Sequence, residues 1–409
     1  MAVASDTPDL LGNHPESRPA QPSLSMKRIV FFSYYVGLGG GETSLRSLLS
    51  ALDRKRYTPI LICPREGRLT QAVRKLDIEV HVIPYWGASI WFVPLLWRAF
   101  PFVQRIKSLL IKLSPAIVQS DFHTLPYVAP ICRKLRIPLI FACWGWWFHP
   151  KPWQRNFYRK GPEIIATMSE SIKYGFIGTQ PFISPDRVQV VYPGVDTNLF
   201  RPFPLEREAI RVELNLDSHA PLVTLIGRFQ SVKGHDVFLS ACKLVAQNSP
   251  ETRFAIAGEN AFGIPSDEAF KQKILSIIAT DRMLQERVKF LGWISEPERL
   301  LAASDIVVCS SYFESFGMVP VEAMASEVPV VSTNVGGPAE TIVDGRTGYL
   351  VPPGRPDLIA EKILMLLSDQ AKRQKMGSAG RERVLQNFSL ERYAANFSKL
   401  LDSLTPKSI

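Results

Sequence analysis

Short apolar runs alternate with helical patterns along the first half of the chain. From Lys27 onward, the runs RIVFFSYY (28–35), YTPILICP (57–64) and PLIFACW (138–144) are apolar on both faces, and helical segments lie between most such runs. Strands that are buried on both faces and separated by helices are typical of a parallel sheet covered on each side. The pattern predicts a doubly wound α/β unit.

The same pattern restarts in the second half. Further strands are predicted at 221–229, 253–260, 288–293, 305–311, 328–334 and 348–353, and helices at 234–247, 267–280 and 296–303. The stretch 196–208 has two prolines and little periodicity, which marks a boundary. We therefore predict two tandem α/β domains, at 27–205 and 206–385, with ligands binding in the cleft beyond the carboxyl ends of their strands.

The chain has 409 residues, more than one ordinary hydrophobic core accommodates. Residues 1–26 are rich in Pro, Ser and Ala and lack the basic start and apolar run of a signal peptide, so we expect a disordered tail and a cytoplasmic protein. The five cysteines form no C-x-x-C pair. Their spacing predicts free buried thiols in a reducing compartment and offers no support for a zinc site.

Positive charge is concentrated in the first half. Residues 27–212 hold 26 Lys and Arg against 12 Asp and Glu, whereas residues 213–409 hold 21 against 23. Such a field attracts anionic partners such as a phosphorylated substrate, anionic lipid or nucleic acid, and it is also compatible with a solvated surface that has no partner. No aromatic and basic nucleic-acid recognition motif accompanies it, so we expect no nucleic acid.

The stretch SSYFESFGMVPVEAMAS (310–326) combines a predicted strand end with a helix start. Glu314 falls in the loop, and Glu322 falls inside a helix that is otherwise apolar all round, where a carboxylate is costly unless it is paired or holds a polar ligand. The amides around Phe316, Gly317 and Met318 are unpaired helix-start donors suited to an anion. A ligand loop is predicted here.

Two cations follow another strand end, in LIGRFQSVKG (225–234). Arg228 comes directly after Gly227, and Lys233 lies in the loop before the next helix. An arginine fork with a lysine point charge suits a diphosphate.

A glycine loop, GLGGGETS (37–44), follows the first strand and opens a helix. Gly40 and Gly41 allow close backbone approach to a ligand, although the loop matches neither dinucleotide nor phosphate-loop fingerprint in strict form.

The order of these pieces carries a resemblance. GGGE, VVYPGVDTNLFRP (190–202), GRFQSVKG, ESFGMVPVEAMA (314–325) and VGGPAETIVDGRTGYLVPPG (335–354) occur in sequence, and together they resemble the retaining GT4-type glycosyltransferases of the GT-B fold, the glycogen synthase-like group. The resemblance implies two Rossmann-like domains facing a central cleft, with a last helix at about 386–409 crossing back to the first. It also implies transfer of a sugar from a nucleoside diphosphate sugar, UDP- or GDP-linked, to a glycan or lipid-linked acceptor hydroxyl with retention of configuration and without a metal.

The resemblance also implies roles for the motif residues. Glu314 would lie near the transferred sugar, with the amides of Phe316 and Gly317 on sugar hydroxyls or phosphate, and Glu322 would accept hydrogen bonds from the ribose. Arg228 and Lys233 would clamp the diphosphate and stabilise the charge that develops as it leaves. The pathway would be polysaccharide, glycolipid or cell-envelope glycan synthesis.

One departure from the family pattern concerns a histidine that follows the strand matching PLIFACW in many members. Trp144 occupies that position here, and His123 and His149 are the other candidates for the sugar or acceptor pocket. We expect Trp144 to line that pocket. A structural role is an equally good interpretation of each histidine.

The stretch 85–113 carries six Trp and Phe residues followed by Arg105, Lys107 and Lys112. It is too interrupted to span a bilayer, but it fits an interfacial segment on anionic lipid. A helix with its aromatic residues in the core is the alternative.

Other functions remain open at this point. The paired glutamates could serve a glycosidase, but hydrolysis gives Arg228 and Lys233 no role. A sugar-nucleotide epimerase on the same fold, a non-catalytic sugar- or lipid-binding relative, and a dinucleotide-dependent oxidoreductase are the further alternatives.

Overall fold

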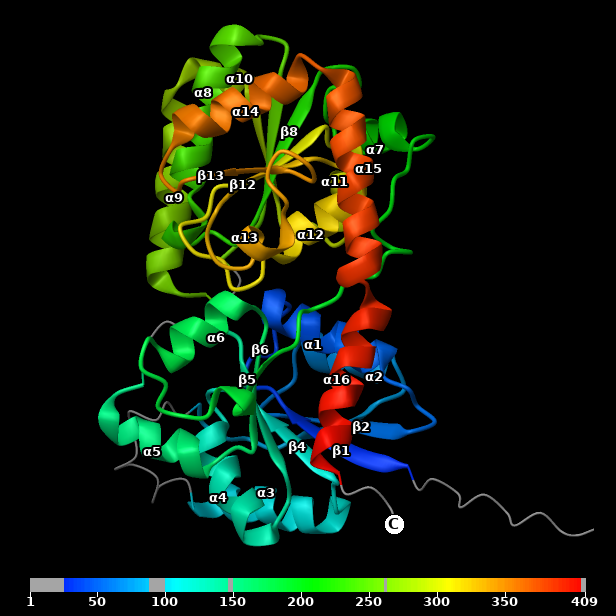
Figure 1. Cartoon of the computed structure of the whole chain (residues 1–409). Helices are drawn as coiled ribbons and strands as arrows, with labels where there is room; N and C mark the ends of the chain where they lie inside the picture. The colour runs from blue at the N-terminus through cyan, green and yellow to red at the C-terminus, as the bar shows by residue number, and fades with distance from the viewer. Residues whose placement is uncertain (1–25, 88–99, 146–149, 261–262, 406–409) are drawn as a thin grey trace, which may run out of the picture.

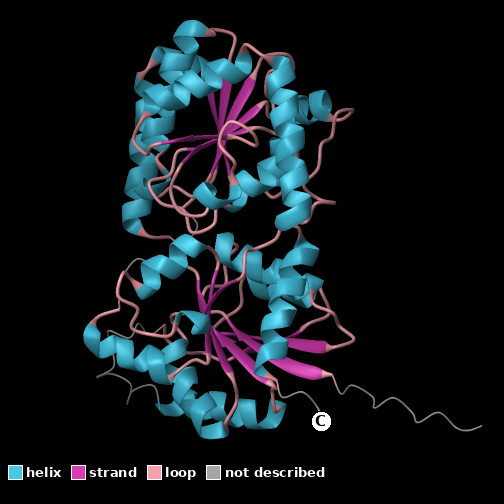
Figure 2. Ribbon diagram, in the orientation of Figure 1, coloured by secondary structure: helices cyan, strands magenta, loops and turns pink. Residues whose placement is uncertain are grey.

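The computed structural model describes residues 26–87, 100–145, 150–260 and 263–405. Two α/β domains are stacked end to end, each with a central sheet between helices (Figures 1 and 2). The tail 1–25 and His149 lie outside the described residues. The predicted two-domain α/β class is confirmed.

The N-terminal domain contains, in its described part, a seven-stranded parallel sheet of order β3-β2-β1-β4-β5-β6-β7. Its strands are β1 (Lys27–Phe32), β2 (Tyr57–Cys63), β3 (Glu79–Val82), β4 (Ile117–Ser120), β5 (Leu139–Cys143), β6 (Ile164–Thr167) and β7 (Val188–Val190). Its helices are α1 (Gly40–Ala51), α2 (Arg68–Arg74), α3 (Phe100–Leu113), α4 (Leu125–Leu135), α5 (Pro152–Lys160) and α6 (Glu170–Ile177).

The C-terminal domain repeats the plan with a described six-stranded parallel sheet of order β10-β9-β8-β11-β12-β13. Its strands are β8 (Leu222–Ile226), β9 (Arg253–Ala257), β10 (Val288–Gly292), β11 (Ile306–Cys309), β12 (Val330–Thr333) and β13 (Tyr349–Val351). Its helices are α7 (Arg207–Glu213), α8 (His235–Asn248), α9 (Pro265–Thr280), α10 (Arg282–Arg287), α11 (Pro297–Ala303), α12 (Met318–Ala325), α13 (Pro338–Thr341), α14 (Pro356–Leu367) and α15 (Gln370–Asn387). The strand order reverses between β1 and β4 and between β8 and β11, where such sheets bind ligands.

The chain crosses between the domains twice, and the two crossings are hydrogen-bonded to each other. The Val195 amide donates to the Phe388 carbonyl at 2.9 Å, and the Leu390 amide donates to the Val195 carbonyl at 3.0 Å. Gly194 must be glycine because a Cβ there would lie 2.4 Å from the Ser389 carbonyl oxygen. The two strands of the junction are therefore fixed side by side.

After the second crossing, α16 (Leu390–Leu404) packs on the N-terminal domain, beside α1 (Figure 1). Its buried face includes Tyr393 and Phe397, and the Phe397 ring lies 6.0 Å from that of Phe31 in β1. The Tyr393 hydroxyl is 3.1 Å from the hydroxyl of Ser44. The described helix that returns to the first domain thus begins at residue 390, after α15 has ended.

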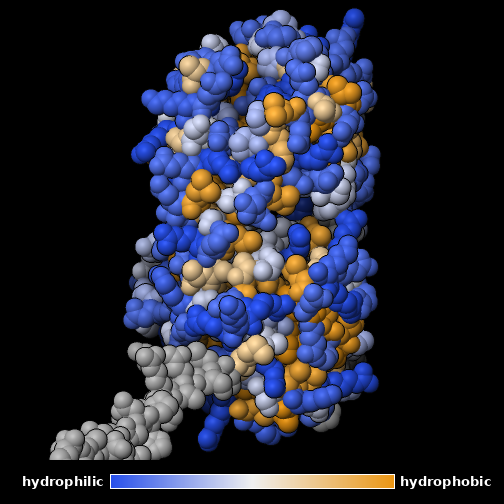
Figure 3. All heavy atoms as spheres, turned by 90° about the vertical axis from the view of Figure 1, so that its right-hand side faces the viewer, coloured by the Kyte–Doolittle hydropathy of each residue, from blue (hydrophilic) through white to orange (hydrophobic). Residues whose placement is uncertain are grey.

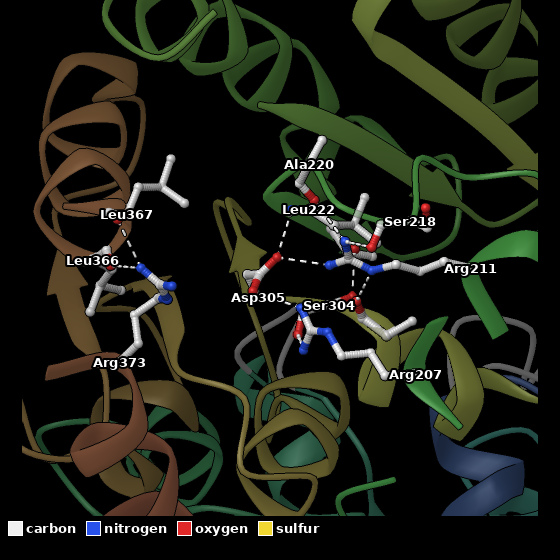
Figure 4. A network of polar contacts seen from close by, with 12 residues as sticks. Arg207, Arg211, Ser218, Ala220, Leu222, Ser304, Asp305, Leu366, Leu367 and Arg373 are labelled. Atoms are coloured by element: carbon white, nitrogen blue, oxygen red, sulfur yellow. Dashed lines mark hydrogen bonds and ion pairs between the residues drawn. The ribbon is translucent and has the colours of Figure 1, made fainter. Parts of the chain in front are cut away.

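A buried arginine ties α7 to the second domain (Figure 4). Arg211 is 2% exposed, and its guanidinium donates to the carbonyls of Ala303 and Ala220 and to the carboxylate of Asp305. Arg207 reaches the other oxygen of Asp305 at 2.6 Å. The buried positive charge is tolerated because all three guanidinium nitrogens donate to carbonyl or carboxylate oxygens.

The aromatic stretch 85–113 divides between core and surface. Residues 88–99 lie outside the described residues, Phe102 is buried against Tyr127, and Trp86 is 60% exposed. The expectation that the aromatic residues face a lipid surface is therefore wrong for Phe102, because α3 turns its apolar face, with Ile106 and Leu110, toward the sheet.

On the face that carries α15 and α16, hydrophilic side chains predominate and hydrophobic ones are scattered among them (Figure 3). All five cysteines are buried and free, as predicted. Within the described residues, every helix is too short or too polar to cross a bilayer.

Candidate active site

A cleft of about 820 Å³ lies between the two domains. It opens beyond the carboxyl ends of β1, β4 and β5 on one side and of β8 and β11 on the other, because residues following all five strands line it. The volume is that of a site for a substantial organic ligand.

The loop between β11 and α12, residues 310–317, forms one wall and is called here the Glu314 loop. The Lys233 ammonium lies 2.5 Å from Glu314 Oε1, and the Ser311 hydroxyl donates to the same oxygen at 2.9 Å. Both charged side chains are mostly buried, at 20% and 13% exposed. The carboxylate is thus aimed and partly neutralised, while a lysine ammonium has two more protons to donate.

The turn into α12 explains why glycine is required at the end of this loop. Gly317 has φ +82°, and a Cβ there would lie 2.9 Å from the Pro338 ring. The preceding Phe316 is 2% exposed. The loop backbone is therefore packed tightly, and the amides at the start of α12 face the cleft together with Met318.

Gly227 follows the last residue of β8 and Arg228 comes next. Both line the cleft. Burial lowers the pKa of Arg228, while the carboxylates of Glu42 and Glu314 oppose that shift. The arginine nevertheless stays charged, since its ordinary pKa is above 12. The structure therefore brings Arg228, Lys233 and Glu314 together, as the motif spacing predicts for a ligand site.

The glycine loop lies across the cleft, at the start of α1. A Cβ at Gly40 would meet nothing within 4 Å, and one at Gly41 would lie 3.9 Å from the Trp144 ring. Glu42 Oε2 accepts a hydrogen bond from the Gly39 amide at 3.1 Å and so caps the helix. Burial raises the pKa of Glu42.

Trp144 and His123 both line the cleft from the N-terminal domain. The His123 ring packs 4.7 Å from Tyr34 and 5.1 Å from Tyr35, measured between ring centroids. Burial lowers the pKa of His123, which keeps the imidazole neutral near pH 7. These two sequence candidates therefore lie in one wall.

Glu322 does not line the cleft. It is 8% exposed on the inward side of α12, and burial, helped by nearby Glu298, raises its pKa to about 7. None of its carboxylate oxygens accepts a hydrogen bond from the described residues. The structure therefore places Glu314 in the cleft lining, while Glu322 is not among the residues that line it.

Several cleft residues were missed by sequence reasoning. Gln119 lies near the end of β4 and Asp121 follows the strand; Asp121 accepts hydrogen bonds from the amides of Tyr34 and Thr124 at 2.6 and 2.8 Å. The available signal was the short apolar run AIVQS (116–120), because ligands in such sheets bind at the carboxyl ends of the strands.

A carboxylate of the second domain holds a helix of the first. Glu340, in α13, accepts from the amides of Glu170 and Ser171 at the start of α6 at 2.9 and 2.8 Å, and from the Tyr192 hydroxyl at 2.9 Å. The N-cap residue of α6, Ser169, donates to the Ser315 carbonyl at 2.6 Å. Two domains are thereby linked beside the Glu314 loop, with a carboxylate at a helix N-terminus.

The described residues contain no group of three or more His, Cys, Asp or Glu side chains that could hold a metal ion.

Two family models match the chain. Residues 206–383 match the model described as glycosyl transferases group 1, and residues 38–199 match glycosyltransferase family 4. The two matches together span both domains and include the Glu314 loop and the glycine loop.

Named relatives agree with these models. A D-inositol 3-phosphate glycosyltransferase of Corynebacterium glutamicum is 33% identical over 82% of this chain and 84% of its own length, and one of Nocardia farcinica is 35% identical over 79% and 67%. An α-maltose-1-phosphate synthase of Mycolicibacterium smegmatis is 29% identical over 60% of this chain. The chain spans 64% of the length of that synthase and about half of several other D-inositol 3-phosphate glycosyltransferases.

Solved structures share the fold. The HepE protein of Anabaena in complex with UDP and glucose superposes with a TM-score of 0.79 at 23% identity, over 92% of this chain and 100% of that one. A glycosyltransferase of Rickettsia africae gives a TM-score of 0.80 at 22% identity, over 93% and 99%.

The raised pKa of Glu322 predicts a pH dependence of stability. The folded carboxyl binds its proton more tightly than the unfolded one, so its stabilising contribution is present below about pH 4.5 and is lost as pH rises through about 7. Between pH 5 and pH 8 the wild type should lose about 2 kcal/mol relative to Glu322→Gln, whose amide does not titrate. Urea unfolding of both proteins across that range measures it, and parallel pH profiles would contradict the assignment.

Glu340 should hold the start of α6 against local opening. Glu340→Gln keeps the shape but places an NH₂ against backbone donors, so we expect exchange at the Glu170 and Ser171 amides to accelerate at least tenfold. Hydrogen exchange read by mass spectrometry measures this. Glu391→Gln, an exposed carboxylate on α16, is the matched control. Unchanged protection in Glu340→Gln would show that the contact contributes nothing in solution.

Proposed function

The chain belongs to the group 1, family 4 glycosyltransferases, and from this premise we propose that it transfers a sugar from a nucleoside diphosphate sugar to an acceptor hydroxyl with retention of configuration. The observation that carries the proposal is the cleft, in which Arg228, Lys233 and Glu314 of one domain face Trp144 of the other. A place in polysaccharide, glycolipid or cell-envelope glycan synthesis is part of the proposal.

The donor is assigned to the C-terminal domain. A diphosphate next to Arg228 and Lys233 would meet two cations in a mostly buried setting, where charge-assisted hydrogen bonds are strong. The Lys233 ammonium can hold Glu314 and a phosphate oxygen at once. Glu314 would then accept from a hydroxyl of the sugar, and the amides of Phe316 and Gly317 would face it.

The reaction needs little beyond this arrangement. The bond between the anomeric carbon and the diphosphate oxygen breaks, the diphosphate leaves with the electron pair, and the acceptor oxygen forms the new bond to that carbon. The acceptor's proton is taken up by the departing diphosphate. Because Arg228 and Lys233 offset charge that grows on the leaving oxygen, they favour the transition state over the ground state. Such a mechanism requires no metal ion.

Glu322 is assigned to the ribose of the donor. Its raised pKa reflects burial without a partner, which a ribose hydroxyl that donates to the carboxylate would compensate. Glu322 lies one turn of α12 after Met318, which lines the cleft.

Donor binding tests the function directly. A thermal-shift panel of UDP, GDP, ADP and NADH should reveal one stabilising nucleoside diphosphate, with UDP tested first because HepE was solved with it. At about 100 times its dissociation constant the ligand adds about 2.7 kcal/mol. Lys233→Ala should lower the affinity at least tenfold, and Lys273→Ala, an exposed lysine on α9, should not. Silence from all three diphosphates, or a shift with NADH alone, would overturn the function.

With the donor known, the anomeric proton coupling of the product tests stereochemistry. The coupling class should match that of the donor sugar, and inversion would refute the retaining mechanism.

We also propose that the N-terminal domain docks on an anionic membrane surface. Arg105 and Lys112 of α3 and Arg133 and Lys134 of the adjoining α4 are exposed, and the exposed Trp86 packs edge-on against α3. Clustered cations beside an exposed tryptophan, whose ring is apolar with one polar N–H, fit peripheral binding to anionic lipid from the cytoplasmic side.

Flotation with vesicles containing phosphatidylglycerol tests this docking. At low salt the wild type should float with the vesicles, and the double variant Arg105→Glu and Lys112→Glu should bind at least fivefold less, since each cation near such a surface contributes about 1 kcal/mol. Lys273→Glu is the control for charge reversal. Wild-type protein that does not float with the vesicles at low salt would refute the docking.

A further inference from the structure

The wall that the N-terminal domain contributes to the cleft differs chemically from the opposite wall. Among the described residues that line the cleft, both cations, Arg228 and Lys233, come from the C-terminal domain. The charged groups on the N-terminal side are Glu42 and Asp121, and His123 is neutral. The Lys and Arg side chains of the described part of residues 27–212 are therefore not on this wall.

Gln119 is the most informative polar group of this wall. It is the third residue of the buried strand β4, is 3% exposed, and still lines the cleft. No side-chain hydrogen bond joins its carboxamide group to a described residue. A buried amide without a partner is costly unless something in the cleft completes it. Because an amide both donates and accepts, its natural complement is a hydroxyl group.

Glu42 offers a second position of the same kind. Its carboxylate caps α1 through the Gly39 amide and lines the cleft from the start of that helix. Both oxygens of Asp121 are used by Tyr34 and Thr124. A carboxylate in the cleft lining can accept from a hydroxyl but repels a phosphate, and this repulsion grows in a partly desolvated cleft.

Aromatic rings complete the wall. Trp144 and Tyr35 line the cleft, and His123 packs against Tyr35 and Tyr34. Flat rings suit the carbon-bound hydrogens of a sugar face, while the few polar groups between them fix its orientation.

Two N-terminal arginines lie outside this lining. The Arg65 guanidinium is 5.5 Å from the Tyr34 ring centroid, and that of Arg68 is 4.8 Å from the Trp293 ring of the other domain. Both are exposed, and neither lines the cleft. An acceptor phosphate that paired with either of them would have to lie outside the described cleft lining.

We propose that the acceptor presents an uncharged sugar ring to this wall, read by Gln119 and Glu42, and that a phosphorylated polyol is not the acceptor. This inference rests on the proposed glycosyltransfer. It separates the chain from the relatives named as D-inositol 3-phosphate glycosyltransferases, because here the cations of the cleft belong to the diphosphate side.

Matched acceptor pairs test the proposal. The full chain with its sugar nucleotide is supplied with methyl glycosides of common hexoses against the corresponding hexose 6-phosphates, and with myo-inositol against inositol phosphate. Nucleoside diphosphate release above the acceptor-free rate is measured. We expect the best neutral glycoside to stimulate release at least tenfold more than any phosphorylated compound. Equal or greater stimulation by a phosphorylated compound overturns the proposal, and so does failure of every neutral sugar.

Variants add a second readout. Gln119→Leu should raise the KM for the neutral acceptor at least tenfold, whereas Gln71→Leu, an exposed glutamine on α2, should leave it unchanged. An unchanged KM in Gln119→Leu overturns the role of the amide. A phosphorylated acceptor whose stimulation is lost in Arg65→Gln would place the acceptor at the rim instead.

The two levels of inference fail in different ways. If no nucleoside diphosphate binds, the proposed function itself is wrong. If one binds and its sugar nucleotide is slowly hydrolysed, but phosphorylated acceptors stimulate nucleoside diphosphate release more than neutral ones, only the acceptor class is wrong.

Discussion

The Glu314 loop is held by both domains at once, and the geometry of the cleft depends on that constraint. The Phe316 ring packs between Tyr192 of the first crossing and Phe388 of the second, with centroids 6.1 and 5.8 Å away. The segment after β12 packs against the same loop, because a Cβ at Gly336 would lie 1.6 Å from the Glu314 carbonyl oxygen. A loop fixed in this way cannot move without disturbing the junction between the domains.

The same junction couples the position of one domain to chemistry in the other. Ser169 and Glu340 join α6 to the loop and to the segment beneath it, so a rotation of the N-terminal domain would pull directly on the Ser315 carbonyl. Domain closure in such enzymes excludes water and completes the site. Here the hydrogen bonds lie next to the carboxylate that is assigned to the sugar, which makes the loop a point where closure and catalysis meet.

The sequence allowed prediction of residues whose position follows from strand ends. Arg228, Lys233 and Glu314 each follow an apolar strand, and parallel strands bring their carboxyl ends to one edge. What could not be predicted depends on contacts distant in sequence. The pairing of Glu340 with Glu170 spans 170 positions, and whether Phe102 faces lipid or core is decided by the helix against which it packs. Glu322 shares α12 with residues that line the cleft, and a helix pattern gives its apolar surroundings but not which side of the helix meets the cleft.

Charge is divided in this molecule by function rather than by domain. The first half carries the excess of Lys and Arg, yet its described cleft wall holds carboxylates, an amide and rings. The second half is nearly neutral and supplies both cations of the described cleft lining. Exposed cations act over about 8 Å at physiological salt, so the outer basic surface and the cleft are largely independent. If Arg228 and Lys233 serve the donor diphosphate, then a second anion in the cleft would compete with it. An uncharged acceptor avoids that competition, and this is the physical reason for the division.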